Sequence, residues 1–371
     1  MTIDGKICFV VGGLPFGGIA GVLLNVCKEF QKRGLDFVIV NVSGTGEKIS
    51  DFEYHKLPLI NLFDSVDALK TYRVDTIFKL RQFIKDANPA IIHTMEFSGD
   101  YFGRLAAVGL DIPVIAHIHN IKSQRKYHRK IANRLLSLKT DLFLCVSEAV
   151  NDVVKREHSA KKRRIVLYNA LNPESFKGKQ KLYPYRKNPE VPIVACVGRL
   201  VKQKNFDLVI KALKSLEHQP VNVVLWIIGE GPERKNLESL TRDLGLEGKV
   251  TFFGYRKDVI DLLTKTDILL MPSQYEGLGM TFLEAMYFGI PAVISEHVPA
   301  KEIASDSCLV CDTTPDSIAE KIATLFSDDK LYEKLAKNTE KRSREFTIDK
   351  YVDKLLDIYE KVLADKSGKQ R

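Results

Sequence analysis

Short apolar runs alternate along the chain with stretches whose apolar residues recur every three or four positions. Alternation of strand and helix patterns is typical of a parallel sheet covered by helices on both faces. The first half therefore predicts an α/β domain that opens with a strand, a glycine-rich loop and a helix over 19–32. Its strands are expected at 6–11, 37–42, 90–93, 114–117, 142–146 and 165–168.

The pattern is interrupted once and then restarts. Residues 179–192 are polar, basic and contain three prolines, which is typical of a linker. Beyond it we expect strands at 193–197, 221–228, 250–253, 268–271 and 292–295, with helices from 205, over 233–244 and ending near 288. We predict two similar α/β domains, 1–178 and 193–346. The tail, 347–371, has the spacing of an amphipathic helix.

Composition supports a two-domain globular protein. The chain has 371 residues, 45% of them apolar, and that length exceeds what one hydrophobic core usually organises. We find no run of roughly 18 apolar residues that would predict a membrane span. The apolar N-terminus carries Asp4 and a glycine loop, so a strand and helix explain it better than a signal peptide. We therefore expect a cytoplasmic protein.

The positive charge is concentrated in the first half. The net charge is +9, and residues 1–178 hold 26 Lys and Arg against 18 Asp and Glu. The densest clusters lie at 122–134 and 161–164. Such clusters suit anionic lipid head groups, polyanionic acceptors or nucleic acid. A solvated helix face is the alternative interpretation.

The segment 273–289, SQYEGLGMTFLEAMYFG, follows an apolar strand. Open α/β sheets bind ligands at the carboxyl ends of their strands. Gly277 and Gly279 permit close backbone approach, and free amides at the start of the next helix favour phosphate oxygens. Glu284 is surrounded in sequence by apolar residues, so its carboxylate either binds ligand hydroxyls or lies on an exposed stripe of that helix.

Two further segments follow predicted strands. Gly198-Arg199-Leu200 with Lys204-Asn205 places two cations before a helix, which suits a pyrophosphate but also a solvated basic turn. His117 and His119 end another strand on one side of it. A lone strand-end histidine is more often structural, whereas two at the carboxyl edge of a sheet favour a functional role. We find no Asp-x-Asp motif, so the sequence offers no obvious holder for a divalent metal.

Taken in order, these motifs resemble the retaining glycosyltransferases of family four, which have the GT-B architecture. The spacing of Glu276 and Glu284 within PSQYEGLG and EAM carries most of the resemblance. The other matching segments are GGLPFGG at 12–18, HN at 119–120, VSE at 146–148, YNA at 168–170, GEGP at 229–232 and FGYR at 253–256. The chain departs at Asn172, where many relatives carry Asp, and at Gly279-Met280.

The resemblance implies a fold of two facing Rossmann-like domains, with the final helix, 347–371, packing back on the first. It also implies a role for each site residue. Arg199 and Lys204 would neutralise the donor diphosphate, and Glu284 would bind the ribose hydroxyls. Glu276 would hold hydroxyls of the donor sugar, and His119, rather than His117, would lie near its anomeric centre; these two are the expected catalytic residues. The remaining donor contacts would come from Gly17, Gly18, Gly277, Leu278, Gly279, Met280 and Thr281, with Tyr255 and Arg256 near the base.

The implied reaction transfers a sugar from a nucleotide-sugar, with UDP as the preferred nucleotide, with retention of configuration and without a metal or another cofactor. The acceptor would be lipid-linked or a saccharide in surface or extracellular polysaccharide synthesis. We expect contact of the basic first domain with the inner membrane face and no nucleic-acid partner. The alternatives are another GT-B enzyme, an epimerase or phosphorylase, or an inactive basic protein that binds membranes or polyanions.

Overall fold

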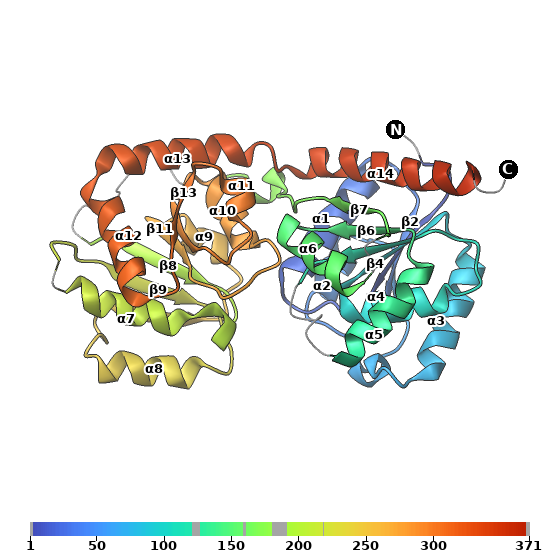
Figure 1. The fold of residues 1–371 in the computed structure, drawn as a ribbon, viewed down its shortest axis with the longest axis horizontal. Coiled ribbons are helices and arrows are strands. Elements are labelled where there is room, and N and C mark those ends of the chain that lie inside the picture. The colour runs from blue at the N-terminus through green and yellow to red at the C-terminus, as the bar shows by residue number, and fades with distance from the viewer. Residues whose placement is uncertain (1–2, 121–126, 159–160, 180–190, 218, 369–371) are drawn as a thin grey trace. The chain divides into compact units, whose positions relative to one another are not determined.

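The computed structural model describes residues 3–120, 127–158, 161–179, 191–217 and 219–368, which form two compact units (Figure 1). Unit 1 comprises Met1–Leu171 and Ile348–Arg371, and unit 2 comprises Asn172–Thr347. Unit 2 is therefore one continuous segment inserted between the two parts of unit 1.

Unit 1 is built on a parallel seven-stranded sheet with the order β3-β2-β1-β4-β5-β6-β7. The strands are β1 (Ile7–Val11), β2 (Phe37–Asn41), β3 (Leu59–Asn61), β4 (Ile91–Met95), β5 (Val114–Ile118), β6 (Leu142–Cys145) and β7 (Arg164–Val166). The helices are α1 (Gly18–Lys32), α2 (Ile49–Tyr54), α3 (Val74–Ala87), α4 (Glu96–Ala106), α5 (Tyr127–Leu136), α6 (Glu148–Glu157) and α14 (Ile348–Gly368).

The order of the strands reverses between β1 and β4. The chain moves outward from β1 to β3 and then returns to place β4 on the other side of β1. Because crossovers between parallel strands are right-handed, the helices before and after this reversal cover opposite faces of the sheet. Strands β1, β2, β4, β5 and β6 are buried along their whole length, as expected for a sheet covered on both faces.

Helix α14 packs on helix α1 of unit 1 (Figure 1). Its buried side chains include Tyr351, Leu355 and Tyr359, spaced to form one face of the helix. The Tyr359 hydroxyl lies 2.5 Å from Nδ1 of His93 on β4, and Arg33 pairs with Asp353 at 2.5 Å. The last helix thus completes the core of the unit that the first strand begins.

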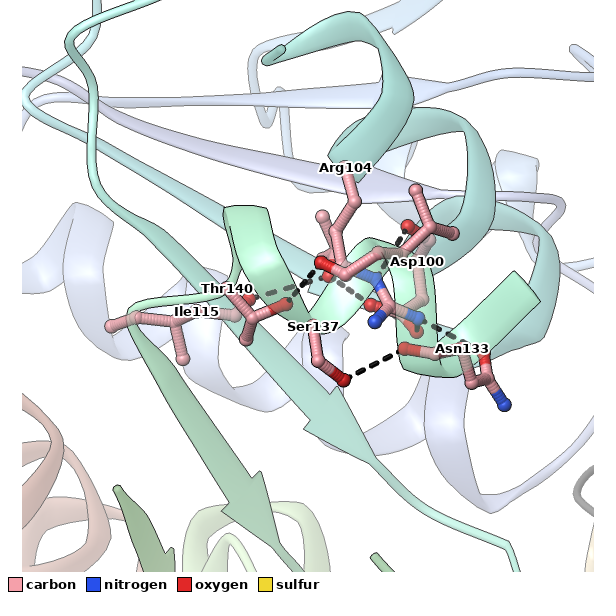
Figure 2. A network of polar contacts seen from close by, with 8 residues as sticks. Asp100, Arg104, Ile115, Asn133, Ser137 and Thr140 are labelled. Carbon is pink, nitrogen blue, oxygen red and sulfur yellow. Dashed lines mark hydrogen bonds and ion pairs between the residues drawn. The ribbon is translucent and has the colours of Figure 1, made fainter. Parts of the chain in front are cut away.

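A buried polar network fixes helix α4 to the sheet of unit 1 (Figure 2). Asp100 and Arg104, both on α4, form an ion pair with side chains only 3% and 1% exposed. Thr94 of β4 donates to Asp100 at 2.8 Å, and Arg104 donates to Asn133 of α5 at 3.1 Å. Because a buried charge must be paired and hydrogen-bonded, this network fixes α4 against both β4 and α5.

Unit 2 has a parallel six-stranded sheet with the order β10-β9-β8-β11-β12-β13. The strands are β8 (Ile193–Val197), β9 (Val224–Ile228), β10 (Val250–Gly254), β11 (Ile268–Met271), β12 (Ala292–Ser295) and β13 (Cys308–Cys311). The α-helices are α7 (Phe206–Leu216), α8 (Arg234–Asp243), α9 (Val259–Leu263), α10 (Met280–Tyr287), α11 (Lys301–Ala304), α12 (Pro315–Ser327) and α13 (Asp329–Ser343). Here the order reverses between β8 and β11.

The boundary between the units lies earlier than the sequence indicated. We predicted a first domain of 1–178, but the residues from Asn172 belong with unit 2. The reason is Phe176, whose ring packs 4.9 Å from Tyr287 and 5.3 Å from Phe288, measured between ring centroids. Most of the predicted linker, 180–190, lies outside the described residues.

The expected pair of parallel α/β sheets is confirmed, but strands β3 and β13 were not predicted. Both lie at sheet edges. β3 has three residues and β13 has four, and both strands are partly exposed. Within the described residues, no helix combines the length and the apolar character needed to cross a bilayer.

Candidate active site

Two of the predicted motifs meet at the strand reversal of unit 2. The Gly198–Asn205 segment follows β8, and the Ser273–Gly279 segment follows β11, its neighbour in the sheet. In open α/β sheets, ligands bind in the crevice at the carboxyl ends of the strands where the strand order reverses. The fold therefore places the predicted donor motifs where such a sheet forms its ligand site.

Lys204 and Glu276 are in direct contact at this point. The Lys204 ammonium lies 2.5 Å from a carboxylate oxygen of Glu276, and the two side chains are 18% and 13% exposed. The Ser273 hydroxyl donates to the same carboxylate oxygen at 2.7 Å. A charged pair that is largely withdrawn from water but keeps an open side can exchange one partner for a charged or hydroxyl-bearing ligand.

Side-chain amides join the two loops and so fix this ion pair. Asn205, in the left-handed region at φ 51°, donates to the carbonyl of Pro272 at 2.9 Å. Gln274 donates to Asn205 at 3.0 Å, and Gln203 donates to the carbonyl of Tyr275 at 2.6 Å. The loops after β8 and β11 are thus one polar assembly.

Gly198 is required where Lys204 crosses the first loop. Gly198 has φ 147°, and a Cβ placed there would lie 3.1 Å from Cε of Lys204. Gly229, after β9, is packed still more tightly, because its Cβ would lie 1.9 Å from the carbonyl oxygen of Gly198. The GEGP turn, uninformative by itself in the sequence, supports the loop that carries Lys204.

The segment 277–281 leads from the ion pair into α10. Leu278 is buried, Gly279 adopts φ 105°, and Met280 and Thr281 form the first turn of the helix. α10 buries the neighbours of Glu284 on both sides, while Glu284 itself is half-buried. The backbone amides of 280 and 281 therefore point from a helix N-terminus, where anions bind favourably.

Arg199, Tyr255 and Arg256 are less closely associated with this ion pair. Arg199 is exposed, and Tyr255 is 47% exposed after β10, two strands from β8. Arg256 pairs with Asp258 at 2.6 Å, and this carboxylate raises the pKa of the guanidinium. All three lie at the carboxyl edge of the sheet, but the structure does not bring them into the Lys204–Glu276 contact.

Unit 1 carries a second polar cluster at its own strand reversal. The loop that holds Gly17 and Gly18 follows β1, and both glycines are exposed at the start of α1. His119 follows β5, and its ring centroid lies 3.9 Å from that of His117. His117 in turn lies 3.1 Å from His93, measured between ring nitrogens. The two predicted histidines thus lie on the same side of their strand. With His93 and Tyr359 they form a buried row of side chains.

These histidines are uncharged at neutral pH. Burial lowers the pKa of His119 to about 3 and that of His93 to about 3, and it lowers the pKa of His117 well below its usual value. Among the described residues, neither ring nitrogen of His119 has a hydrogen-bond partner. A neutral imidazole that is buried without partners can donate or accept a hydrogen bond to a bound ligand.

His119 lines a pocket of about 200 Å³ in unit 1. The pocket also contains Glu96, a residue that the sequence interpretation missed. Glu96 directly follows β4, is half-buried, and has φ 64°, which is rare for a residue with a side chain. Its only signal in the sequence is a carboxylate immediately after a buried strand. The lining residues are Ile19, Glu96, Phe97, Asp100, His117, Ile118, His119 and Asn120.

The described residues contain no cluster of metal-binding side chains. Across residues 3–120, 127–158, 161–179, 191–217 and 219–368, no group of three or more His, Cys, Asp or Glu side chains is arranged to hold a metal ion. All six cysteines are free thiols. Burial raises the pKa of Cys8 and Cys145 to about 12, so these thiols stay protonated at neutral pH.

Two parallel-sheet units with polar loops at their strand reversals agree with the GT-B architecture that the sequence predicted. Residues 16–175 match the family model described as Glycosyltransferase Family 4, and residues 180–342 match Glycosyl transferases group 1. Together the two matches account for most of the chain, which therefore belongs to this family of glycosyltransferases. The suspected family, the fold class and the enzyme class are confirmed.

Relatives and solved structures agree with this assignment. An uncharacterized glycosyltransferase of Haemophilus influenzae is 25% identical over 91% of this chain and 94% of its own length. The UDP-Gal:alpha-D-GlcNAc-diphosphoundecaprenol alpha-1,3-galactosyltransferase of Escherichia coli is 25% identical over 83% of this chain and 88% of its own length. The structure of Anabaena HepE in complex with UDP superposes with a TM-score of 0.81 over 96% of this chain and 100% of that one, at 19% identity.

Proposed function

We propose that this glycosyltransferase moves a sugar from UDP to a lipid-linked or saccharide acceptor, with retention of configuration and without a metal. The observation that carries the proposal is the Lys204–Glu276 pair at the strand reversal of unit 2. Lys204 supplies the positive charge for a departing diphosphate, and Glu276 supplies a carboxylate for sugar hydroxyls. UDP is favoured because a similar fold binds UDP and a relative uses a UDP-sugar.

In the same way, Arg199 and the backbone amides contact phosphate groups, and the remaining carboxylate and histidine contact sugar groups. Arg199 adds a second cation at the carboxyl end of β8, and the amides of 277–281 bind phosphate oxygens. Glu284, one helical turn further, accepts hydrogen bonds from the ribose. In unit 1, His119 binds the transferred sugar near its anomeric centre, and Gly17 and Gly18 allow the backbone to approach the diphosphate. Tyr255 and Arg256 contact the base. Catalysis then consists of positioning and charge stabilisation.

The acceptor pathway is proposed from the relatives. The Escherichia coli enzyme acts on a diphosphoundecaprenol-linked sugar, so a lipid-linked acceptor in surface polysaccharide synthesis is the proposal that fits best. Such an acceptor lies in the cytoplasmic leaflet, which implies a cytoplasmic enzyme that works at the membrane surface.

One surface of unit 1 fits that membrane contact. Three aliphatic side chains, Ile131, Leu135 and Leu138, are 48%, 64% and 81% exposed at successive helical turns. Beside them Lys130, Arg134 and Arg156 line a groove of about 420 Å³ together with Glu157, which pairs with Lys130 at 3.3 Å. Exposed aliphatic residues next to cations are the combination that binds anionic bilayers. Of the predicted clusters, 121–126 lies outside the described residues, and Arg163 is already paired with Asp365 at 2.5 Å.

The nucleotide proposal is tested by thermal unfolding with UDP, GDP and ADP, each with and without EDTA. A ligand at a hundred times its Kd stabilises the folded state by about 2.7 kcal/mol. Selective stabilisation by UDP that survives EDTA supports a metal-independent UDP site, whereas no shift with any nucleotide contradicts it. The anomeric configuration of the product, read by NMR, tests retention.

The membrane proposal is tested separately by flotation with phosphatidylcholine vesicles, with and without phosphatidylglycerol. The wild type should float only with the anionic lipid, and the Leu135→Gln and Leu138→Gln double variant should float less. Equal flotation of both proteins, or none with anionic vesicles, would contradict a membrane role for this surface. The donor site of unit 2 is untouched by these changes, so UDP stabilisation serves as the control.

A further inference from the structure

The pocket of unit 1 contains a carboxylate that the proposed donor chemistry does not use. Glu96 is the first residue of α4, directly after β4, and β4 is the strand that returns beside β1 at the strand reversal. Its position in unit 1 corresponds to that of the Glu276 loop in unit 2, which follows β11 beside β8. The position is therefore the ligand-binding end of the second sheet.

The backbone at Glu96 has a left-handed conformation that is rare for a residue with a side chain. A φ of 64° is unfavourable for any residue with a Cβ, and glycine adopts it without strain. A strained backbone at the mouth of a pocket is a marker of a functional residue when an independent feature agrees. The independent feature here is the pocket itself, which Glu96 lines together with the partnerless ring of His119.

Glu96 is held on a rigid support. The backbone amide of Gly13, in the glycine loop after β1, donates to its carboxylate. The helix that begins at Glu96 is fixed to the sheet through Thr94, Asp100 and Arg104 (Figure 2). The carboxylate is therefore positioned before any ligand arrives, which reduces the entropy lost on binding.

The described lining of the pocket suits hydroxyl groups better than a phosphate. Among the described residues, it has two carboxylates, Glu96 and Asp100, and no Lys or Arg, and its histidines are neutral. A diphosphate would meet only negative or neutral groups there, whereas a carboxylate and a neutral imidazole are a donor–acceptor set for sugar hydroxyls. Ile19 and Phe97 offer apolar contacts to the carbon face of a sugar ring.

We propose that Glu96 is an acceptor-binding residue, whose carboxylate accepts a hydrogen bond from a hydroxyl of the acceptor saccharide. This rests on the proposed transferase function. It assigns the hydroxyls of the donor sugar mainly to Glu276 and those of the acceptor to Glu96. The sugar of the donor would present the same hydroxyl chemistry, so the experiment separates the two sources.

The test compares wild type, Glu96→Gln and Glu96→Gly with Glu53→Gln, an exposed glutamate of α2, as the matched control. The donor is UDP-galactose, and the acceptor probe is α-N-acetylglucosaminyl diphosphate carrying a short alkyl chain. Release of UDP to water, without acceptor, reports the donor side independently. We expect Glu96→Gln to lower kcat/KM for the acceptor about tenfold or more, as for a lost hydrogen bond to a charged group. The KM for the donor and the thermal shift with UDP should stay at the wild-type values.

The pH profile provides a readout that a purely structural role would not change. Burial raises the pKa of Glu96 to about 7, so kcat/KM for the acceptor should rise through that pH as the carboxylate ionises. Among the described residues, the other titratable groups facing the pocket are His117, His119 and Asp100. Both histidines stay neutral at this pH. Burial raises the pKa of Asp100, and its ion pair with Arg104 opposes that rise. Glu96→Gln should lack this limb and Glu53→Gln should keep it.

Glu96→Gly separates function from folding. Glycine relieves the strain at φ 64°, so this variant should unfold at the same or a higher temperature while losing acceptor transfer. Wild-type acceptor kinetics in Glu96→Gln would overturn the proposal. A raised donor KM with an unchanged acceptor KM would overturn it too, by assigning Glu96 to the donor sugar. Failure of the proposed function is distinct, because it would remove UDP release and the UDP thermal shift from the wild type itself.

Discussion

Replacing Lys204 by Met tests whether this ammonium binds the donor diphosphate. Methionine keeps most of the length of the side chain and removes its charge. Two unit charges about 4 Å apart interact with roughly 4 kcal/mol at an effective dielectric constant near 20, and with about 1 kcal/mol in water. Lys204 is 18% exposed, so an intermediate value of about 2 kcal/mol is appropriate. UDP should bind roughly thirtyfold more weakly to the variant.

The same geometry predicts the opposite sign for Glu276→Gln. In the ligand-free structure the Glu276 carboxylate neutralises Lys204 at 2.5 Å, and it would repel a bound diphosphate. Without that charge, UDP should bind as tightly as to the wild type or up to about fivefold more tightly, a gain of roughly 1 kcal/mol. Sugar transfer should nevertheless be lost, because the carboxylate that holds the donor hydroxyls is gone.

Isothermal titration calorimetry with UDP measures both effects. Lys211→Met is the matched control, since Lys211 is 45% exposed and pairs with Asp207 on the surface of α7. Wild-type affinity in Lys204→Met would refute the diphosphate role of Lys204. A loss of UDP affinity in Glu276→Gln as large as that in Lys204→Met would refute the electrostatic reasoning and show that the pair acts as a structural unit.

Three further variants test the framework around the sites. Arg104→Met leaves the Asp100 carboxylate buried and unpaired, so the free energy of unfolding in urea should fall by about 3–5 kcal/mol, and Asp100→Asn added to it should recover part of that loss. Burial lowers the pKa of His158 to about 3, so the folded protein loses stability as the pH falls below the pKa of about 6.5 that this histidine has in the unfolded chain. His158→Phe should reduce that loss by about 1.4 kcal/mol per pH unit between roughly pH 6 and 4. An unchanged dependence of the unfolding free energy on pH would contradict this. Gly229→Ala forces a Cβ to 1.9 Å from the Gly198 carbonyl oxygen, so thermal unfolding should show a destabilisation of at least about 2 kcal/mol, with weaker UDP binding.

The sequence predicted the architecture well because buried parallel strands are continuous apolar runs. Strands β8, β11 and β12 have the expected bounds, and β1 begins one residue later than predicted. The carboxyl ends of β8 and β11 could also be recognised from the sequence as ligand positions. Their contact depends on strand order, however, and the pairing of Lys204 with Glu276 followed only from the observed topology.

The features that the sequence did not predict depend on contacts between residues far apart in the chain. Glu96 differs from the glutamates of any exposed helix only through its backbone conformation and the pocket around it. Strands β3 and β13 have only three and four residues and are partly exposed, so each is a weak signal in the sequence. The buried row from His119 to Tyr359 joins residues far apart in sequence, and no local pattern predicts such a contact.

The return of helix α14 to unit 1 has a consequence for synthesis of the chain on the ribosome. Unit 2 is one uninterrupted segment that is complete once residue 347 has left the ribosome, whereas unit 1 at that point still lacks Ile348–Gly368, the helix that packs on α1. Domains generally fold in the order in which they are synthesised. Here the domain that starts first is completed last, and a nascent chain halted before α14 would leave His93 without its Tyr359 partner and an apolar face of α1 open to chaperones.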